Sequence, residues 1–103
     1  MLSSGRKPLS AIALRQFVNK ALDKGWWRED FHSEFDRAYR NISADDVEYG
    51  LERSSWILEK TEPAKEEGLF KYTIRTADIE GDELHLVLLP RTKTGTLRVI
   101  TKY

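Results

Sequence analysis

The fold is decided by the stretch at the end of the sequence, Leu97-Arg98-Val99-Ile100-Thr101-Lys102-Tyr103. Successive side chains of a strand point to opposite faces, so this pattern predicts a β-strand with Arg98 and Lys102 on one face and Tyr103 on the other. Three further strand patterns precede it, at 56–60, 69–76 and 84–89, with turn residues between them. Strands joined by such short turns favour a four-stranded antiparallel β-meander.

The first half of the sequence is predicted to be helical. Apolar residues between 9 and 24 recur at the spacing of an amphipathic helix, with Ser10 as its N-cap and Gly25 as its end. A second helix is predicted over 29–41, and a short third helix begins after Ser43. We therefore predict an α+β domain in which two or three N-terminal helices pack on the four-stranded antiparallel meander.

Length and charge indicate one domain that is not basic overall. A chain of 103 residues fits a flexible lead-in over 1–8 and a single α+β domain over 9–103. With 17 basic and 17 acidic residues, the formal net charge of zero argues against a surface that binds nucleic acid everywhere. The basic residues are concentrated near both ends, since residues 91–103 carry four of them and no acidic residue.

Composition also excludes several kinds of chemistry. The absence of cysteine excludes disulfides, a thiolate nucleophile and sulfur-ligated zinc, and two histidines are too few for a metal cluster. We therefore predict no metal and no cofactor. Because no apolar run approaches about 18 residues and no secretory signal is found, we expect a cytoplasmic protein with no membrane partner.

His32 and Arg40 form the first candidate catalytic pair. They are eight positions apart in the predicted second helix, with Asp36 between them, so all three share one side of that helix. The imidazole can exchange protons near neutral pH, and the guanidinium can bind a phosphate. The alternative interpretation is a solvated helix face on which Asp36 makes ion pairs one turn away.

The last strand and the second strand supply the other candidates. Arg75, Arg98, Lys102 and Tyr103 offer cations for a phosphate backbone and an aromatic ring for stacking, the groups that an RNA-binding face requires. The alternative is the ordinary polar face of a one-sided sheet. His85 lies in the most apolar strand, and we interpret it as a core or edge histidine.

Several of these segments match a known pattern in order and spacing. They are His32, Arg40, the run Asn41-Ile42-Ser43-Ala44-Asp45-Asp46-Val47, Gly81, Leu84-His85-Leu86-Val87 and Val99-Ile100-Thr101-Lys102-Tyr103. Over about 70 residues the chain resembles a family of small prokaryotic proteins, a domain of unknown function related to the RelE/ParE-like (BrnT-like) toxins. The chain departs from that pattern at Ser33, Asp36, Arg37 and Asn41. The resemblance implies helices laid across a four-stranded antiparallel sheet.

The resemblance also implies an activity, metal-independent RNA cleavage. His32 would then be the acid or base, Arg40 the phosphate ligand, and Tyr103 a stacking or proton-transfer group. Arg75, Arg98 and Lys102 are substrate-binding cations inferred from the strand pattern alone.

Two functional hypotheses follow. The first is a toxin-like endoribonuclease that acts on RNA and is restrained by an antitoxin partner. The alternative is a non-catalytic protein-binding or regulatory module, which accepts a partner's strand at an exposed sheet edge. It includes an immunity or antitoxin role through the acidic region 29–52. The oligomeric state is left open.

Overall fold

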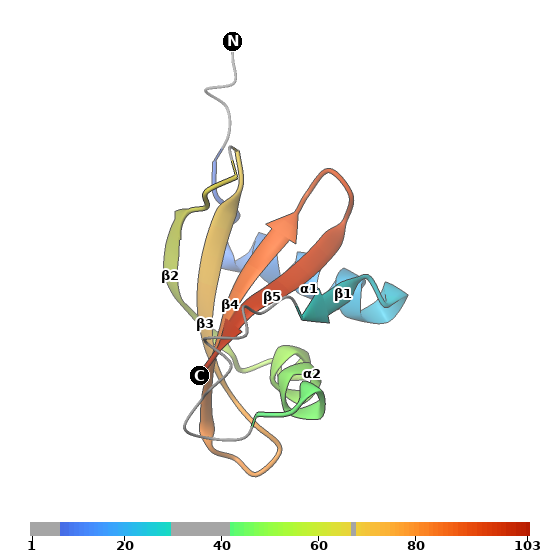
Figure 1. Ribbon diagram of the computed structural model, residues 1–103, viewed down its shortest axis with the longest axis vertical. Helices are drawn as coiled ribbons and strands as arrows, with labels where there is room; N and C mark the ends of the chain where they lie inside the picture. Colours follow the sequence, from blue (N-terminus) through green and yellow to red (C-terminus); the bar gives the residue numbers. More distant parts are fainter. Residues whose placement is uncertain (1–6, 30–41, 67) are drawn as a thin grey trace.

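The computed structural model describes residues 7–29, 42–66 and 68–103 (Figure 1). Two helices and five strands are found in these ranges. In chain order they are α1 (Ala11–Lys24), β1 (Trp27–Glu29), α2 (Ala44–Glu52), β2 (Ile57–Pro63), β3 (Phe70–Ala77), β4 (Glu83–Arg91) and β5 (Thr96–Lys102). Within the same ranges, no helix is long and apolar enough to cross a membrane.

The sheet corrects the predicted architecture. Its strand order is β1-β5-β4-β3-β2, and β1 runs parallel to β5 while the other three pairs are antiparallel. The α+β class matches the prediction, but the four-stranded antiparallel meander implied by a RelE/ParE-like fold is wrong, because the sheet is five-stranded and mixed. The extra strand was missed because Trp27–Glu29 is only three residues long, too short to display alternation. The helix predicted over 29–41 falls almost entirely on residues outside the described ranges.

The two helices begin and end where local chemistry predicts. The Ser10 side chain accepts a hydrogen bond from the Ala13 N–H at the start of α1, and Gly25 ends that helix at φ 72°. At the start of α2, Ser43 and Asp46 form a reciprocal capping box. Both predicted N-caps are confirmed.

The core lies between these helices and one face of the sheet. Helix α1 presents Leu14, Val18 and Ala21, all fully buried. The sheet side of the core consists of alternate residues of three strands, namely Tyr72, Ile74, Leu84, Leu86, Leu88, Leu97 and Val99. The side chains between them therefore point to the opposite face, which we call the outer face.

A β-bulge determines which residues of β5 reach the outer face. Leu88 pairs with Val99 but Val87 pairs with Thr101, so Ile100 is an extra residue in β5. The extra residue reverses the alternation, and Arg98 and Tyr103 share the outer face while Lys102 turns to the helix side. The predicted alternation, which grouped Arg98 with Lys102, is corrected by this bulge.

Tyr72 ties the sheet to the residues before α1. Its hydroxyl oxygen accepts a hydrogen bond from the Leu9 N–H at 2.7 Å, and the residue is 2 % exposed. Tyr72→Phe removes the acceptor, and we expect it to lower the free energy of unfolding by about 1 kcal/mol in urea denaturation at pH 7.

The same pair has a pH dependence with a defined sign. Burial raises the pKa of Tyr72 above its ordinary value of 10.0, although the hydrogen bond from Leu9 acts in the opposite direction. A raised pKa means that the neutral phenol contributes its full stability below pH 10, and that this contribution is lost as the pH rises through the folded value. The stability difference between the wild type and Tyr72→Phe should therefore shrink above pH 10. A difference that stays constant there would contradict the prediction.

Candidate functional site

Four side chains meet at one end of the outer face, and we call them the His85 cluster: Glu59, Arg75, His85 and Tyr103. Nε2 of His85 lies 3.3 Å from Oε1 of Glu59, and Nε of Arg75 lies 3.4 Å from Oε2 of the same carboxylate. The ring of Tyr103 stacks on the His85 imidazole, with centroids 4.9 Å apart and planes 9° apart. A proton-transfer group, a carboxylate, a cation and an aromatic platform are thus held together.

The strand register explains why these residues meet. Arg75 is the β3 partner of His85, and Tyr103 exchanges two backbone hydrogen bonds with His85, of 2.8 and 3.0 Å. Glu59 lies at a second bulge, between Leu58 and Lys60 of β2. Bulges change the direction of a side chain and are enriched beside active sites. Here one bulge carries Glu59, and the other turns Tyr103 onto the outer face.

The cluster is partly open to solvent. The side chains of His85, Glu59 and Arg75 are 20 %, 35 % and 42 % exposed, so each side chain is partly accessible. A second carboxylate, Oε2 of Glu83, lies 3.5 Å from the same His85 nitrogen. A pocket of about 280 Å³ adjoins the cluster, and both Arg75 and Glu83 line it together with Arg53. There is therefore room for a ligand beside the guanidinium groups of Arg53 and Arg75, next to the cluster.

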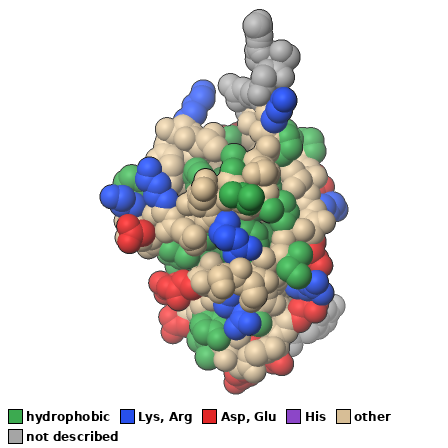
Figure 2. Space-filling model, turned by 180° about the vertical axis from the view of Figure 1, so that it is seen from behind, with side chains coloured by type: hydrophobic (Ala, Val, Ile, Leu, Met, Phe, Trp, Pro, Cys, Tyr) green, Lys and Arg blue, Asp and Glu red, His purple; other side chains and the backbone are tan. Residues whose placement is uncertain are grey.

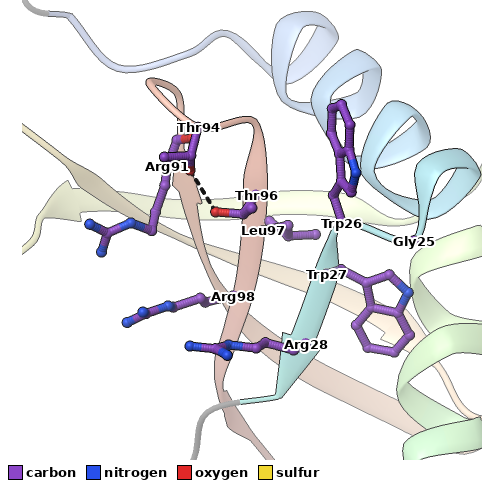
Figure 3. A pocket seen from close by; sticks show the side chains of 9 residues that line it. All are labelled: Gly25, Trp26, Trp27, Arg28, Arg91, Thr94, Thr96, Leu97 and Arg98. Atoms are coloured by element: carbon purple, nitrogen blue, oxygen red, sulfur yellow. Dashed lines mark hydrogen bonds between the residues drawn. The ribbon is translucent and has the colours of Figure 1, made fainter.

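A larger pocket lies at the other end of the outer face, and we call it the tryptophan pocket (Figure 3). Its volume is about 460 Å³, and the lining residues are Gly25, Trp26, Trp27, Arg28, Arg91, Thr94, Thr96, Leu97 and Arg98. Figure 3 shows the three arginine side chains extending to the same side, away from the ring of Trp26. The pocket therefore has a cationic end and an aromatic end.

The structure separates the residues predicted from the sequence into three groups. Arg75 and Tyr103 belong to the His85 cluster, and Arg98 belongs to the tryptophan pocket on the same face. Lys102 lies on the helix side, where its ammonium donates to the Ile42 carbonyl at 2.8 Å and lies 3.5 Å from Oε1 of Glu29. Lys102 thus ties β5 to β1 and to the start of α2. The predicted catalytic residues His32 and Arg40 lie outside the described residues.

Two members of the cluster were missed from the sequence. The sequence predicts a core or edge histidine at position 85, because the stretch 84–89 is largely apolar, but only Leu84, Leu86 and Leu88 of this stretch are fully buried. Strict alternation through β4 would have placed His85 on the outer face, away from Leu84 and Leu86. The structure shows that it lies there beside its β3 partner, Arg75. Glu59 carried no such signal, since its position depends on the bulge in β2.

Within the described ranges, no group of three or more acidic or histidine side chains is arranged to hold a metal ion. Comparison with protein-family models, with curated proteins and with solved structures found no match to this chain. The resemblance inferred from short sequence motifs therefore stays a prediction.

Proposed function

We propose that this chain is a metal-independent endoribonuclease of the toxin-like class, and that the His85 cluster is its catalytic centre. The observation that carries the proposal is the contact of one carboxylate, Glu59, with both an imidazole and a guanidinium. Cleavage of RNA without a metal needs a base, an acid and a cation near one phosphate. The His85 cluster holds all three, on a face that also bears Arg28, Arg91 and Arg98.

Each group has a role in a balanced reaction. Glu59 takes the proton of a ribose 2′-hydroxyl, whose oxygen attacks the adjacent phosphorus. The bond from phosphorus to the 5′-oxygen breaks, and protonated His85 gives its proton to that leaving oxygen. Arg75 stabilises the negative charge on the phosphate oxygens, and Tyr103 offers its exposed ring to a base.

The products provide the direct test. Purified protein incubated with single-stranded RNA in EDTA should yield fragments with 2′,3′-cyclic phosphate and 5′-hydroxyl ends. DNA of the same sequence should stay intact, because it lacks the attacking hydroxyl. RNA that is not cut, or that is cut only when divalent metal is present, would overturn the proposal.

A protein-binding module is the second candidate, and one observation favours it. Several acidic side chains lie on the lower half of the face in Figure 2, the end of the molecule at which α2 lies, with Lys or Arg side chains among them, and such groups would favour a basic partner. Strand addition at β2 is disfavoured, because its bulge, Lys60 and Pro63 are features that protect sheet edges from pairing. Charge reversal at the exposed Glu48 should weaken binding of such a partner and leave RNA cleavage unchanged.

A further inference from the structure

We propose that the tryptophan pocket is a second binding site, which takes one nucleotide of an RNA strand with its base against Trp26 and its phosphate between Arg28 and Arg98. The choice of RNA as the source of that nucleotide rests on the proposed function. Binding of a nucleoside phosphate to the pocket does not rest on the proposed function, because it is inferred from the charge and shape of the pocket itself.

The cationic end of the pocket is built from neighbouring strands. Arg28 of β1 is the register partner of Arg98 of β5, so both side chains leave the same face of the sheet. Arg91, on the next strand, is held at the rim by Glu66, whose Oε1 lies 2.8 Å from its Nη1. A phosphate bound between Arg28 and Arg98 would accept charge-assisted hydrogen bonds from both guanidinium groups.

The aromatic end of the pocket is fixed by the backbone. Trp26 donates a hydrogen bond to the Ala21 carbonyl and accepts one from the Leu97 N–H, both of 2.8 Å. Its ring also packs against the β4–β5 turn, since a Cβ on Gly95 would lie 3.3 Å from its Cζ3 atom. Even so, Trp26 is 43 % exposed. An exposed ring that is already held in place loses little entropy when a base stacks on it.

The size and the remaining polar groups of the pocket fit the same ligand. A volume of about 460 Å³ lies within the range of small-molecule sites, roughly 300–1,000 Å³. The hydroxyl groups of Thr94 and Thr96 lie 2.7 Å apart at the wall and can turn to a ribose hydroxyl. A nucleotide has a flat base, a polar sugar and an anionic phosphate in a row, which matches the aromatic, hydroxyl and cationic parts of the wall.

The pocket and the His85 cluster lie on one path across the outer face. His85 and Arg91 are on the same side of β4 and six residues apart, or about 20 Å at 3.3 Å per residue. An RNA strand of several nucleotides would span both sites. The pocket would therefore bind a nucleotide some distance from the bond that is cut.

Binding measurements test the inference separately from cleavage. We would titrate a labelled six-nucleotide RNA and an unlabelled mononucleotide against the wild type, Arg28→Gln and Trp26→Leu, with Lys20→Ala as a control that also removes one exposed positive charge. We expect each pocket variant to weaken RNA binding by at least about fivefold and the control to change it by less than about twofold. The slope of the logarithm of the binding constant against the logarithm of the salt concentration should decrease by about one for Arg28→Gln, and should not change for Trp26→Leu. Thermal denaturation would show that each variant is folded.

The outcomes distinguish the two proposals. If RNA is cut but the pocket variants bind it like the wild type, the second site is refuted and the endoribonuclease stands. If the mononucleotide binds with the same dependence on Trp26 and Arg28 but no RNA is cut, the nucleotide site stands and the proposed function fails. A mononucleotide that binds as tightly as the six-nucleotide RNA would refute the assignment of the pocket to an RNA strand.

Discussion

Replacing His85 by alanine is expected to slow RNA cleavage by at least about a hundredfold, the usual contribution of one proton-transfer group. Among the described residues, the neighbours of His85 are carboxylates, a guanidinium and a phenol, so no second imidazole can take over its proton transfer. Glu59→Gln should cause a loss of similar size, since the amide cannot accept the proton of the 2′-hydroxyl. The measurement is the single-turnover rate of cleavage with saturating protein.

The control for Glu59→Gln comes from the same strand, β2. Glu62 pairs with Lys60 at 3.7 Å, outside the His85 cluster, so Glu62→Gln makes the same chemical change without touching it. Its cleavage rate should match the wild type. Removing a proton-transfer group should also remove one limb of the pH–rate profile, which a purely structural residue would not do. Full activity of folded His85→Ala and Glu59→Gln would exclude the cluster as the catalytic centre.

Gly50→Val is expected to lower the free energy of unfolding by about 3 kcal/mol, the upper range for overpacking a core. Helix α2 packs against β3 and β4 at this buried residue. A Cβ on Gly50 would lie 2.8 Å from Cγ2 of Thr76, and the Thr76 hydroxyl donates to the Gly50 carbonyl at 2.8 Å. The added side chain must therefore push α2 away from the sheet and break this buried hydrogen bond. Urea denaturation measures the loss.

A matched variant isolates the effect of the contact. Glu48 is exposed on the same helix, so Glu48→Val introduces the same β-branched residue without a clash. It should cost less than about 1 kcal/mol, the difference in helix propensity. Equal losses for the two variants would show that the close approach at Gly50 contributes nothing to stability.

The parts of the fold that depend on neighbouring residues were predictable. Ser10 and Ser43 cap the helices through contacts three residues away, and the apolar spacing of α1 needs only its own sequence. Strand β1 was not predictable in this way, because its pairing partner lies far along the chain. The bulge at Ile100 was hidden for the same reason: it is defined only relative to β4, and it sends Lys102 to the helix side.

The candidate site shows the same division. Arg75 and Tyr103 were identified because cations and aromatic residues on strands indicate a binding face. His85 and Glu59 were not, since the first required the phase of β4 and the second a bulge in β2. The prediction that His32 and Arg40 form the catalytic pair lies outside the described residues and stays a prediction.

The parallel pairing of β1 with β5 has a consequence for the order in which the molecule assembles. The antiparallel strands β2 to β5 are joined by short connections, so closing each loop costs little entropy and these strands can pair early in folding. Strand β1 can pair only after β5 has formed, because its residue Trp27 pairs with Leu97, which lies far from it in the sequence. We therefore expect the hairpins that carry His85 to form first, and β1 with Arg28 to be added to the sheet last.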